Sequence, residues 1–318
     1  MTTEITAAHP APAPKPARTL RERLTRNPVV LKELRGRMRG ARAFLLLTFH
    51  LLAMSGFVTL LYATYMASIN SASSGANSQW LGKVVFGGVV GVELLLACFI
   101  TPAVTAGAIS GERERQTYDL LRTTLLSAQA LVLGKLASAL LFVLLLLLVA
   151  LPLQSLAFLL GGVAPEEVLI ASVLLIATAF LFGSAGIFFS SLMRRTLGAT
   201  VLTYSFALLD TLGLPLLMLA VLPLAGLFFY SAPPGPFLEA TLIYVFGLLI
   251  SLNPIATAIT TEALLVNQYQ TALYFTFPLS SGVSIPLVSP WLPCVIFCFG
   301  LGGLMVLMSI QMVKSAER

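Results

Sequence analysis

The sequence predicts an all-α polytopic membrane protein, and three observations carry that prediction. Only 10% of the residues are charged, against about 25% in soluble domains, and the mean hydropathy is +0.94. Apolar stretches recur along the chain, and most of them exceed the roughly 20 residues that a membrane-spanning helix needs. Lys and Arg gather in a few short segments between those stretches. An ordinary soluble domain is therefore excluded.

The apolar stretches predict six transmembrane helices within a transmembrane domain that covers residues 43–313. Each stretch contains at most one charged residue. Pro215 and Pro223 fall inside the fifth stretch, which we expect to be one long helix kinked at these prolines, because proline removes a backbone donor and crowds the preceding turn. The six expected spans are 43–67, 84–110, 129–160, 168–192, 197–229 and 291–313.

A further apolar stretch, 237–258, has two interpretations. It lies in a segment, 230–290, that contains no Lys or Arg. With six spans the whole segment is external, and 237–258 is a re-entrant or interfacial helical piece. The alternative makes 237–258 a true span and splits 197–229 at Gly213/Pro215, which gives eight spans. Either count is even, so either places both termini on the same side of the membrane.

The distribution of Lys and Arg predicts which side that is. Ten of the 19 basic residues lie between Lys15 and Arg42, before the first span, and others surround the 111–128 loop and the 193–196 turn. Cytoplasmic loops carry an excess of Lys and Arg. We therefore expect a multi-pass protein of the cytoplasmic (inner) membrane with both termini in the cytoplasm, the C-terminal tail being 314–318.

Two segments precede the first span. Residues 1–27 begin with an Ala-, Pro- and Thr-rich run and are expected to form a disordered cytoplasmic tail. Residues 28–42 begin with a proline suited to the first turn of a helix and combine apolar residues at helical spacing with a charged stripe. We expect an amphipathic interface helix on the inner membrane surface, which either anchors the topology alone or also contacts a cytoplasmic partner. Its candidate contact residues are Lys32, Glu33, Arg35 and Arg39.

The densest charge of the chain lies in the 111–128 loop. Six of the 32 charged side chains fall within eleven residues, from Glu112 to Arg122, and a hydrocarbon core does not accept such a segment. We expect a helix here whose apolar face can dock onto a partner, with Ser127 capping the next span. The alternative is a solvated loop helix whose charges pair only with one another. The candidate docking residues are Glu112, Glu114, Arg115, Tyr118, Asp119, Leu121, Arg122 and Leu125.

Residues 105–127 and the following Leu133-Gly-Lys-Leu136 resemble permease subunits of the type 2 ABC-transporter family. Members commonly read Gly-Glu-(Arg/Lys)-Glu-x-Gly-Thr-x-(Asp/Glu)-Leu-Leu, then Thr-Pro-(Leu/Val)-Ser, then Gly-Lys, between the second and third spans. Residues 27–39 look like the N-terminal interface helix of that family. Gln116 and Leu126 stand where glycine and proline are usual, and both residues favour a more continuous helix.

By that resemblance, residues 112–127 are a coupling helix that docks into a separate ABC ATPase subunit, and the chain is the permease of an ATP-driven exporter. A second permease subunit, identical or different, would complete the translocation path. The sequence has no phosphate-binding Gly-x-x-x-x-Gly-Lys-Ser/Thr loop. We therefore expect a half-transporter in the lipid bilayer that is not itself an enzyme, holds no cofactor and binds no nucleic acid, with ATP and Mg²⁺ held by the partner ATPase.

Glu93 and Asp210 are candidate functional residues because ionisable groups inside spans are costly and are often retained for function. They either line a substrate path or relay protons, or they are neutral and hydrogen-bonded to a neighbouring helix. An ion-coupled secondary transporter using both residues and a non-transporting membrane scaffold are the alternative functions. Gly87, Gly88 and Gly91 predict close helix packing. No catalytic set and no metal site is indicated, and the three cysteines are expected to be buried apolar residues.

Overall fold

The computed structural model describes residues 30, 32–33, 36, 41–71, 78–117, 127–221, 235–268 and 273–315. Six helices in these ranges are long and apolar enough to cross a membrane, which confirms the all-α polytopic class. The elements are α3 (Ala41–Ser71), α4 (Ser78–Thr105), α5 (Ser110–Glu114), α7 (Ala128–Leu160), α8 (Pro165–Leu192), α9 (Thr196–Leu208), the π-helical η1 (Leu209–Gly213), α11 (Pro236–Leu252), α12 (Pro254–Gln268), β1 (Tyr274–Pro278), β2 (Ser284–Val288) and α13 (Trp291–Ser315).

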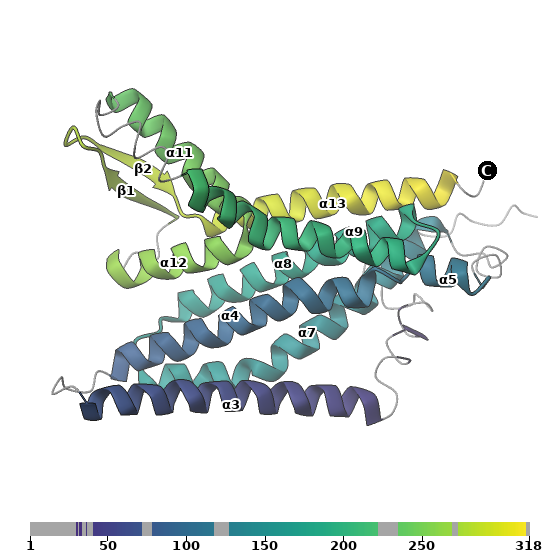
Figure 1. Cartoon of the computed structure of the whole chain (residues 1–318), viewed down its shortest axis with the longest axis horizontal. Coiled ribbons are helices and arrows are strands. Elements are labelled where there is room, and N and C mark those ends of the chain that lie inside the picture. Colours follow the sequence, from purple (N-terminus) through teal and green to yellow (C-terminus); the bar gives the residue numbers. More distant parts are fainter. Residues whose placement is uncertain are drawn as a thin grey trace, which may run out of the picture.

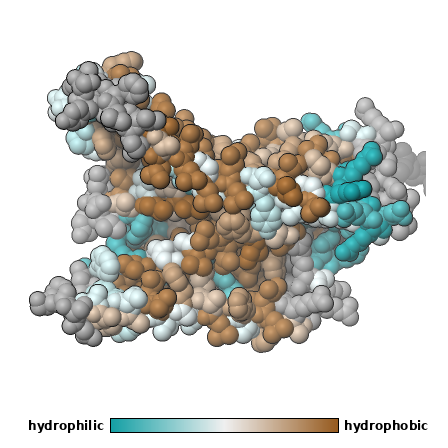
Figure 2. Space-filling view, viewed as in Figure 1, coloured by the Kyte–Doolittle hydropathy of each residue, from teal (hydrophilic) through white to brown (hydrophobic). Residues whose placement is uncertain are grey.

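The long helices run side by side, with α3 at one edge and α8 in the interior (Figure 1). Helix α8 packs against α4, α7, α9 and α13 and is the most buried of the candidate spans. The short α5 lies at the same end of the bundle as the C-terminus, and the β1–β2 hairpin lies at the opposite end. Figure 2 shows apolar residues over the middle of this face and hydrophilic residues gathered at the α5 end. This is the surface pattern of a protein that sits in a bilayer.

Glycines set how closely three helix pairs approach. A Cβ on Gly186 of α8 would overlap Thr105 of α4, and a Cβ on Gly302 of α13 would come within 2.8 Å of Phe180 on α8. Gly88 of α4 faces α3, where a Cβ would meet Leu61 at 2.8 Å. Removal of the side chain at these positions lets the backbones pack closely.

The predicted glycine packing in the second span is only partly correct. Gly88 makes the close approach to α3, whereas a Cβ on Gly87 or Gly91 would meet nothing within 4 Å. Glycines 87 and 91 are one helical turn apart, so they share a face of α4. That face borders a cavity instead of a packed helix.

The helix ends depart from the expected spans by a few residues. The second span begins at Ser78 instead of 84, so Lys83 lies inside α4. Its ammonium bonds the Glu167 carboxylate at 3.0 Å, near the start of α8. The predicted cap on the third span is confirmed, because the Ser127 side chain accepts a hydrogen bond from the backbone N–H of Ala130 at 3.3 Å.

The expected irregularity in the fifth span is a π-helical turn. Residues 196–221 form one continuous helix in which η1 lies immediately before Leu214 and Pro215. A π-turn inserts an extra residue into the helix, which provides room for the ring of a following proline. The other predicted kink site, Pro223, lies outside the described residues.

The apolar stretch 237–258 forms two helices that meet at a sharp bend. The axes of α11 and α12 differ in direction by 119° at Asn253. The free ends of both helices point away from α5, and their junction lies against the α9–η1 helix (Figure 1). This geometry is that of a broken span or a re-entrant loop, so the described residues contain six spans, or seven if the pair counts as one. The alternative of eight spans is not found in them.

A β-hairpin, which the apolar pattern of the sequence does not predict, follows α12. Strands β1 and β2 pair antiparallel with Tyr274 opposite Val288. Gly282 turns the chain between them with φ of +81°, a conformation that glycine adopts without steric cost. The hairpin therefore joins the bent helix pair to α13 at the end of the bundle opposite α5.

Candidate functional site

The charged segment after α4 begins as the short helix α5, which is fixed to the ends of two long helices. The backbone N–H groups of Ile109 and Ser110 donate to the Ser190 hydroxyl of α8 at 2.8 and 3.0 Å. Arg113 donates to the backbone carbonyl of Ser191 at 2.9 Å, at the negative end of the α8 dipole. At the start of α9, the Thr196 hydroxyl donates to Glu114 at 2.6 Å. Helix α5 is thus fastened across the α8–α9 turn.

A buried lysine connects α5 to two other segments. The ammonium of Lys135, near the start of α7, lies 3.1 Å from a Glu33 carboxylate oxygen and 3.2 Å from a Glu112 oxygen. The Lys135 side chain is only 5% exposed. One ammonium therefore holds the N-terminal segment and α5 together, and its burial is compensated by two carboxylates. A lone lysine inside the otherwise uncharged stretch 129–160 is the sequence signal for this role, although the predicted coupling residues do not include it.

Glu112 is held in its ionised form. Burial alone would raise its pKa, but the hydrogen bond from the Thr117 hydroxyl and the charge of Lys135, with a smaller contribution from Lys32, lower the pKa below its ordinary value. The residue lies beyond the 28-residue α4, which at about 1.5 Å per residue already exceeds the roughly 30 Å hydrocarbon thickness. The Glu112 carboxylate therefore remains ionised at neutral pH.

The segment departs from the continuous helix expected over 111–128. Helix α5 ends at Glu114, and Gln116 has a φ of +56°. This is the left-handed conformation that glycine adopts without cost. The expectation that Gln116 extends the helix is therefore wrong: the backbone turns at this residue although it is not a glycine. The Thr117 hydroxyl donates a hydrogen bond to the Glu112 carboxylate, which closes the turn.

The predicted docking and interface residues divide into two groups. Glu112 is half-buried in the cluster described above, while Glu114 and Arg115 are exposed; Lys32 is exposed and Glu33 half-buried. The other predicted residues lie outside the described residues, namely Arg35, Arg39, Tyr118, Asp119, Leu121, Arg122 and Leu125. The structure thus brings Glu33 and Glu112 together at Lys135 and places Glu114, at the end of α5, against Thr196 of α9.

The two predicted intramembrane acids lie in separate contacts. Glu93 of α4 is fully buried and accepts a hydrogen bond from the Gln154 amide of α7 at 2.7 Å. Its other oxygen has no partner among the described residues. Asp210 is buried in η1, and its side-chain Oδ2 likewise has no partner there. The hydrogen-bond arrangement predicted as the alternative is therefore present for Glu93.

Asn253 stabilises the bend between α11 and α12 and the π-turn together. Its side-chain amide donates to the backbone carbonyls of Asp210 and Thr211, the latter at 3.2 Å, while its Oδ1 accepts from the backbone N–H of Ala256 at 2.7 Å. One buried side chain thus caps α12 and satisfies carbonyls of the π-turn in α9–η1. The Asn-Pro pair at 253–254 is the sequence signal for such a helix break.

The three cysteines are buried free thiols. Cys294 and Cys298 of α13 pack with Leu174, Ala177 and Leu181 of α8, as expected for small apolar residues. The described residues contain no group of three His, Cys, Asp or Glu side chains that could hold a metal ion.

Comparison with known proteins assigns no relative to the chain. No protein-family model matches it, and no curated protein matches it. The resemblance in residues 27–39 and 105–136 therefore rests on those motifs alone.

Proposed function

We propose that the chain is the permease subunit of an ATP-driven ABC exporter, with both termini in the cytoplasm of an inner-membrane protein and the α5 end facing a separate ATPase subunit. The observation that carries the proposal is the attachment of α5. The charged segment that resembles a coupling helix begins in a helix joined to the N-terminal segment, α7, α8 and α9 by the bonds of Lys135, Ser190, Arg113 and Thr196.

These bonds support a mechanical role for the segment. A coupling element must move the membrane helices when its partner moves, and a loop with slack connections would absorb the displacement instead. Buried hydrogen bonds to the end of α8, together with the partly buried Lys135 cluster, restrict the movement of α5 relative to α7 and α8. A push on residues 111–128 would therefore displace the ends of α7, α8 and α9 together.

The backbone at Gln116 adds a second support. The resembling sequences usually have glycine at this position, and the chain adopts there the left-handed conformation that glycine favours. The turn that such a glycine would make is thus retained by a different residue. This agrees with a docking loop whose shape is maintained although one residue of its motif has changed.

A path for the displacement leads from α5 to the opposite end of the bundle. Helix α9 continues into η1, and η1 is bonded to Asn253 at the α11–α12 bend. Movement of α9 along its axis would carry this bend with it. ATP-driven closure of the partner subunits would in this way open or close the far end of a translocation path formed with a second permease subunit.

The experiment is purification of the tagged full-length chain from its native membranes, with identification of co-purifying subunits and measurement of ATP hydrolysis. We expect a subunit with a phosphate-binding loop to co-purify and to hydrolyse ATP. The double variant Leu121→Asp/Leu125→Asp places two charges on the apolar face of the predicted coupling helix. It should lose both the co-purifying ATPase subunit and the ATP hydrolysis. The matched control is Val283→Asp, an exposed apolar residue of the hairpin at the opposite end.

Three outcomes would contradict the proposal. The first is the absence of any ATPase subunit from the purified complex. The second is equal ATPase recovery with the double variant and the control. The third is transport by the reconstituted chain alone, driven by an ion gradient and abolished by Glu93→Gln, which would favour the secondary transporter.

A further inference from the structure

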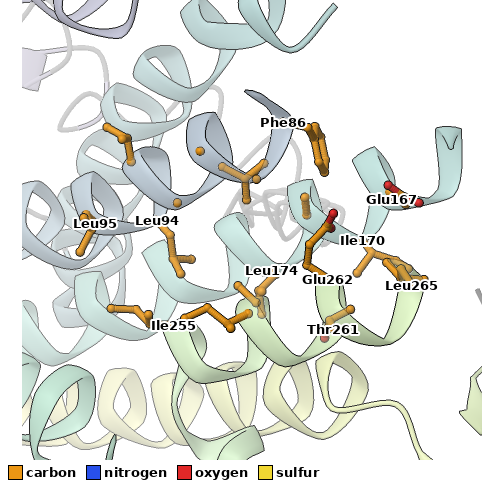
Figure 3. A pocket seen from close by; sticks show the side chains of 18 of the residues that line it. Phe86, Leu94, Leu95, Glu167, Ile170, Leu174, Ile255, Thr261, Glu262 and Leu265 are labelled. Atoms are coloured by element: carbon orange, nitrogen blue, oxygen red, sulfur yellow. The ribbon is translucent and has the colours of Figure 1, made fainter. Parts of the chain in front are cut away.

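A cavity of about 580 Å³ lies between α4, α8 and α12, within the range of about 300–1,000 Å³ typical of small-molecule sites. Its walls are apolar and are contributed by all three helices (Figure 3). Gly87 and Gly91 border it, and the absence of side chains at these two positions provides part of its volume. Its large apolar lining residues include Phe86, Leu94, Ile170, Leu174, Ile255 and Leu265.

Two carboxylates occupy one end of this cavity. Glu167, at the start of α8, and Glu262, on α12, both line it, on neighbouring helices in Figure 3. The Glu167 side chain is 7% exposed, and while its Oε1 bonds Lys83, its Oε2 has no partner among the described residues. Glu262 is half-buried, and its Oε1 likewise has no partner in the described part of the chain.

The charge at this end is unbalanced. Glu262 interacts electrostatically with both Glu167 and Lys83, so two carboxylates share one ammonium. The sequence provides no other Lys or Arg between Arg42 and Arg113 or between Arg195 and Lys314, whereas Glu166, next to Glu167, adds a further acid. A buried carboxylate without a cationic partner is costly. An incoming cation would therefore be stabilised here, and an anion would be repelled.

We propose that this cavity binds an amphipathic cation, with an apolar body of drug size between α4, α8 and α12 and a cationic group against Glu262 and the free oxygen of Glu167. The apolar walls provide affinity by burial, and the carboxylates select the sign of the charge. The inference rests on the proposed function only for the step from binding to transport, where it names the substrate class. Binding itself requires neither ATP nor a partner.

The test is equilibrium binding of radiolabelled tetraphenylphosphonium to the full chain in phosphatidylcholine nanodiscs, with empty nanodiscs subtracted. Tetraphenylborate has nearly the same shape and the opposite charge, so it separates charge from apolarity. We expect saturable binding of the cation and at least tenfold weaker binding of the anion. Glu262→Gln should weaken cation binding about tenfold, equivalent to about 1.4 kcal/mol. Gly91→Leu, whose side chain would enter the cavity, should abolish binding.

Glu166→Gln is the matched control, because it removes an exposed carboxylate one residue away from Glu167 and changes the net charge equally. It should bind tetraphenylphosphonium like the unchanged chain. Equal binding of cation and anion, equal effects of Glu262→Gln and Glu166→Gln, or normal binding to well-folded Gly91→Leu would each overturn the inference. A phospholipid that copurifies in the cavity and is not displaced by tetraphenylphosphonium would also do so.

The failure of this inference can be distinguished from failure of the proposed function. If the ATPase subunit co-purifies with the chain and tetraphenylphosphonium does not bind, only the substrate class is wrong. If tetraphenylphosphonium binds as expected and no ATPase subunit is found, the binding site is supported and the ATP-driven mechanism is wrong.

Discussion

Replacement of Lys135 by methionine tests the cluster that connects α5 to the bundle. Methionine has a similar length and removes the ammonium that the carboxylates of Glu33 and Glu112 share. Loss of one partner from a fully buried ion pair costs about 3–5 kcal/mol, and an exposed pair contributes about 0–1 kcal/mol. Lys135 is 5% exposed, but the carboxylates are 27% and 26% exposed. We therefore expect Lys135→Met to lower the free energy of unfolding by about 2 kcal/mol.

The assay is unfolding in mixed micelles as a function of the mole fraction of sodium dodecyl sulfate. A double-mutant cycle with Glu112→Gln isolates the contact, since it removes the contributions that each residue makes independently. We expect a coupling energy of about 1 kcal/mol between Lys135 and Glu112. Lys314→Met, at the exposed end of α13, is the control and should change stability by less than about 0.5 kcal/mol. A coupling energy of zero, or equal effects of Lys135→Met and Lys314→Met, would refute the reasoning.

Four further outcomes are expected. Asn253→Ala should destabilise the chain by about 2–3 kcal/mol, because two buried backbone carbonyls and one helix N–H lose their partner; unchanged unfolding would contradict this. Gln116→Gly should stabilise by about 0.5–1 kcal/mol, because it relieves the left-handed backbone, and a loss of stability would show that the turn is not populated. In the same micelle unfolding assay, Gly88→Leu should lower the free energy of unfolding by at least about 1–3 kcal/mol through overpacking. Gly91→Leu should leave the free energy of unfolding nearly unchanged. Because the pKa of Glu112 is lowered in the folded state, its stabilising contribution should be present above the unfolded pKa of about 4.3 and lost as pH falls through the lower folded value; a loss between pH 8 and 6 would contradict this.

The sequence predicts the six long helices because the length of an apolar stretch is a local property. It predicts their ends less well, since a helix can continue past a charge that is neutralised by a distant residue. Lys83 illustrates this: it lies inside α4 because Glu167, 84 positions later, supplies the opposite charge. The β1–β2 hairpin is missed because its strands are short and contain prolines, which weaken the strand pattern.

For the site residues too, local features are predictable from the sequence, and contacts between distant residues are not. The charge density around Glu112 predicts that α5 lies outside the hydrocarbon, but the bonds from Ser190 and Thr196 depend on which helix ends meet in space. The role of the glycines is not predictable from composition either. Gly88 and Gly91 both line the cavity, but only Gly88 also packs closely against α3, whereas a Cβ on Gly91 would meet open space.

The most direct test of the central claim is photocrosslinking from a single position of the 111–128 segment in native membranes. A photoreactive amino acid in place of Tyr118 should crosslink to a subunit that contains a phosphate-binding loop. The same amino acid in place of Val283, in the hairpin at the opposite end, should not. Crosslinking of Tyr118 only to lipid or to the chain itself, or equal crosslinking from both positions, would contradict the account.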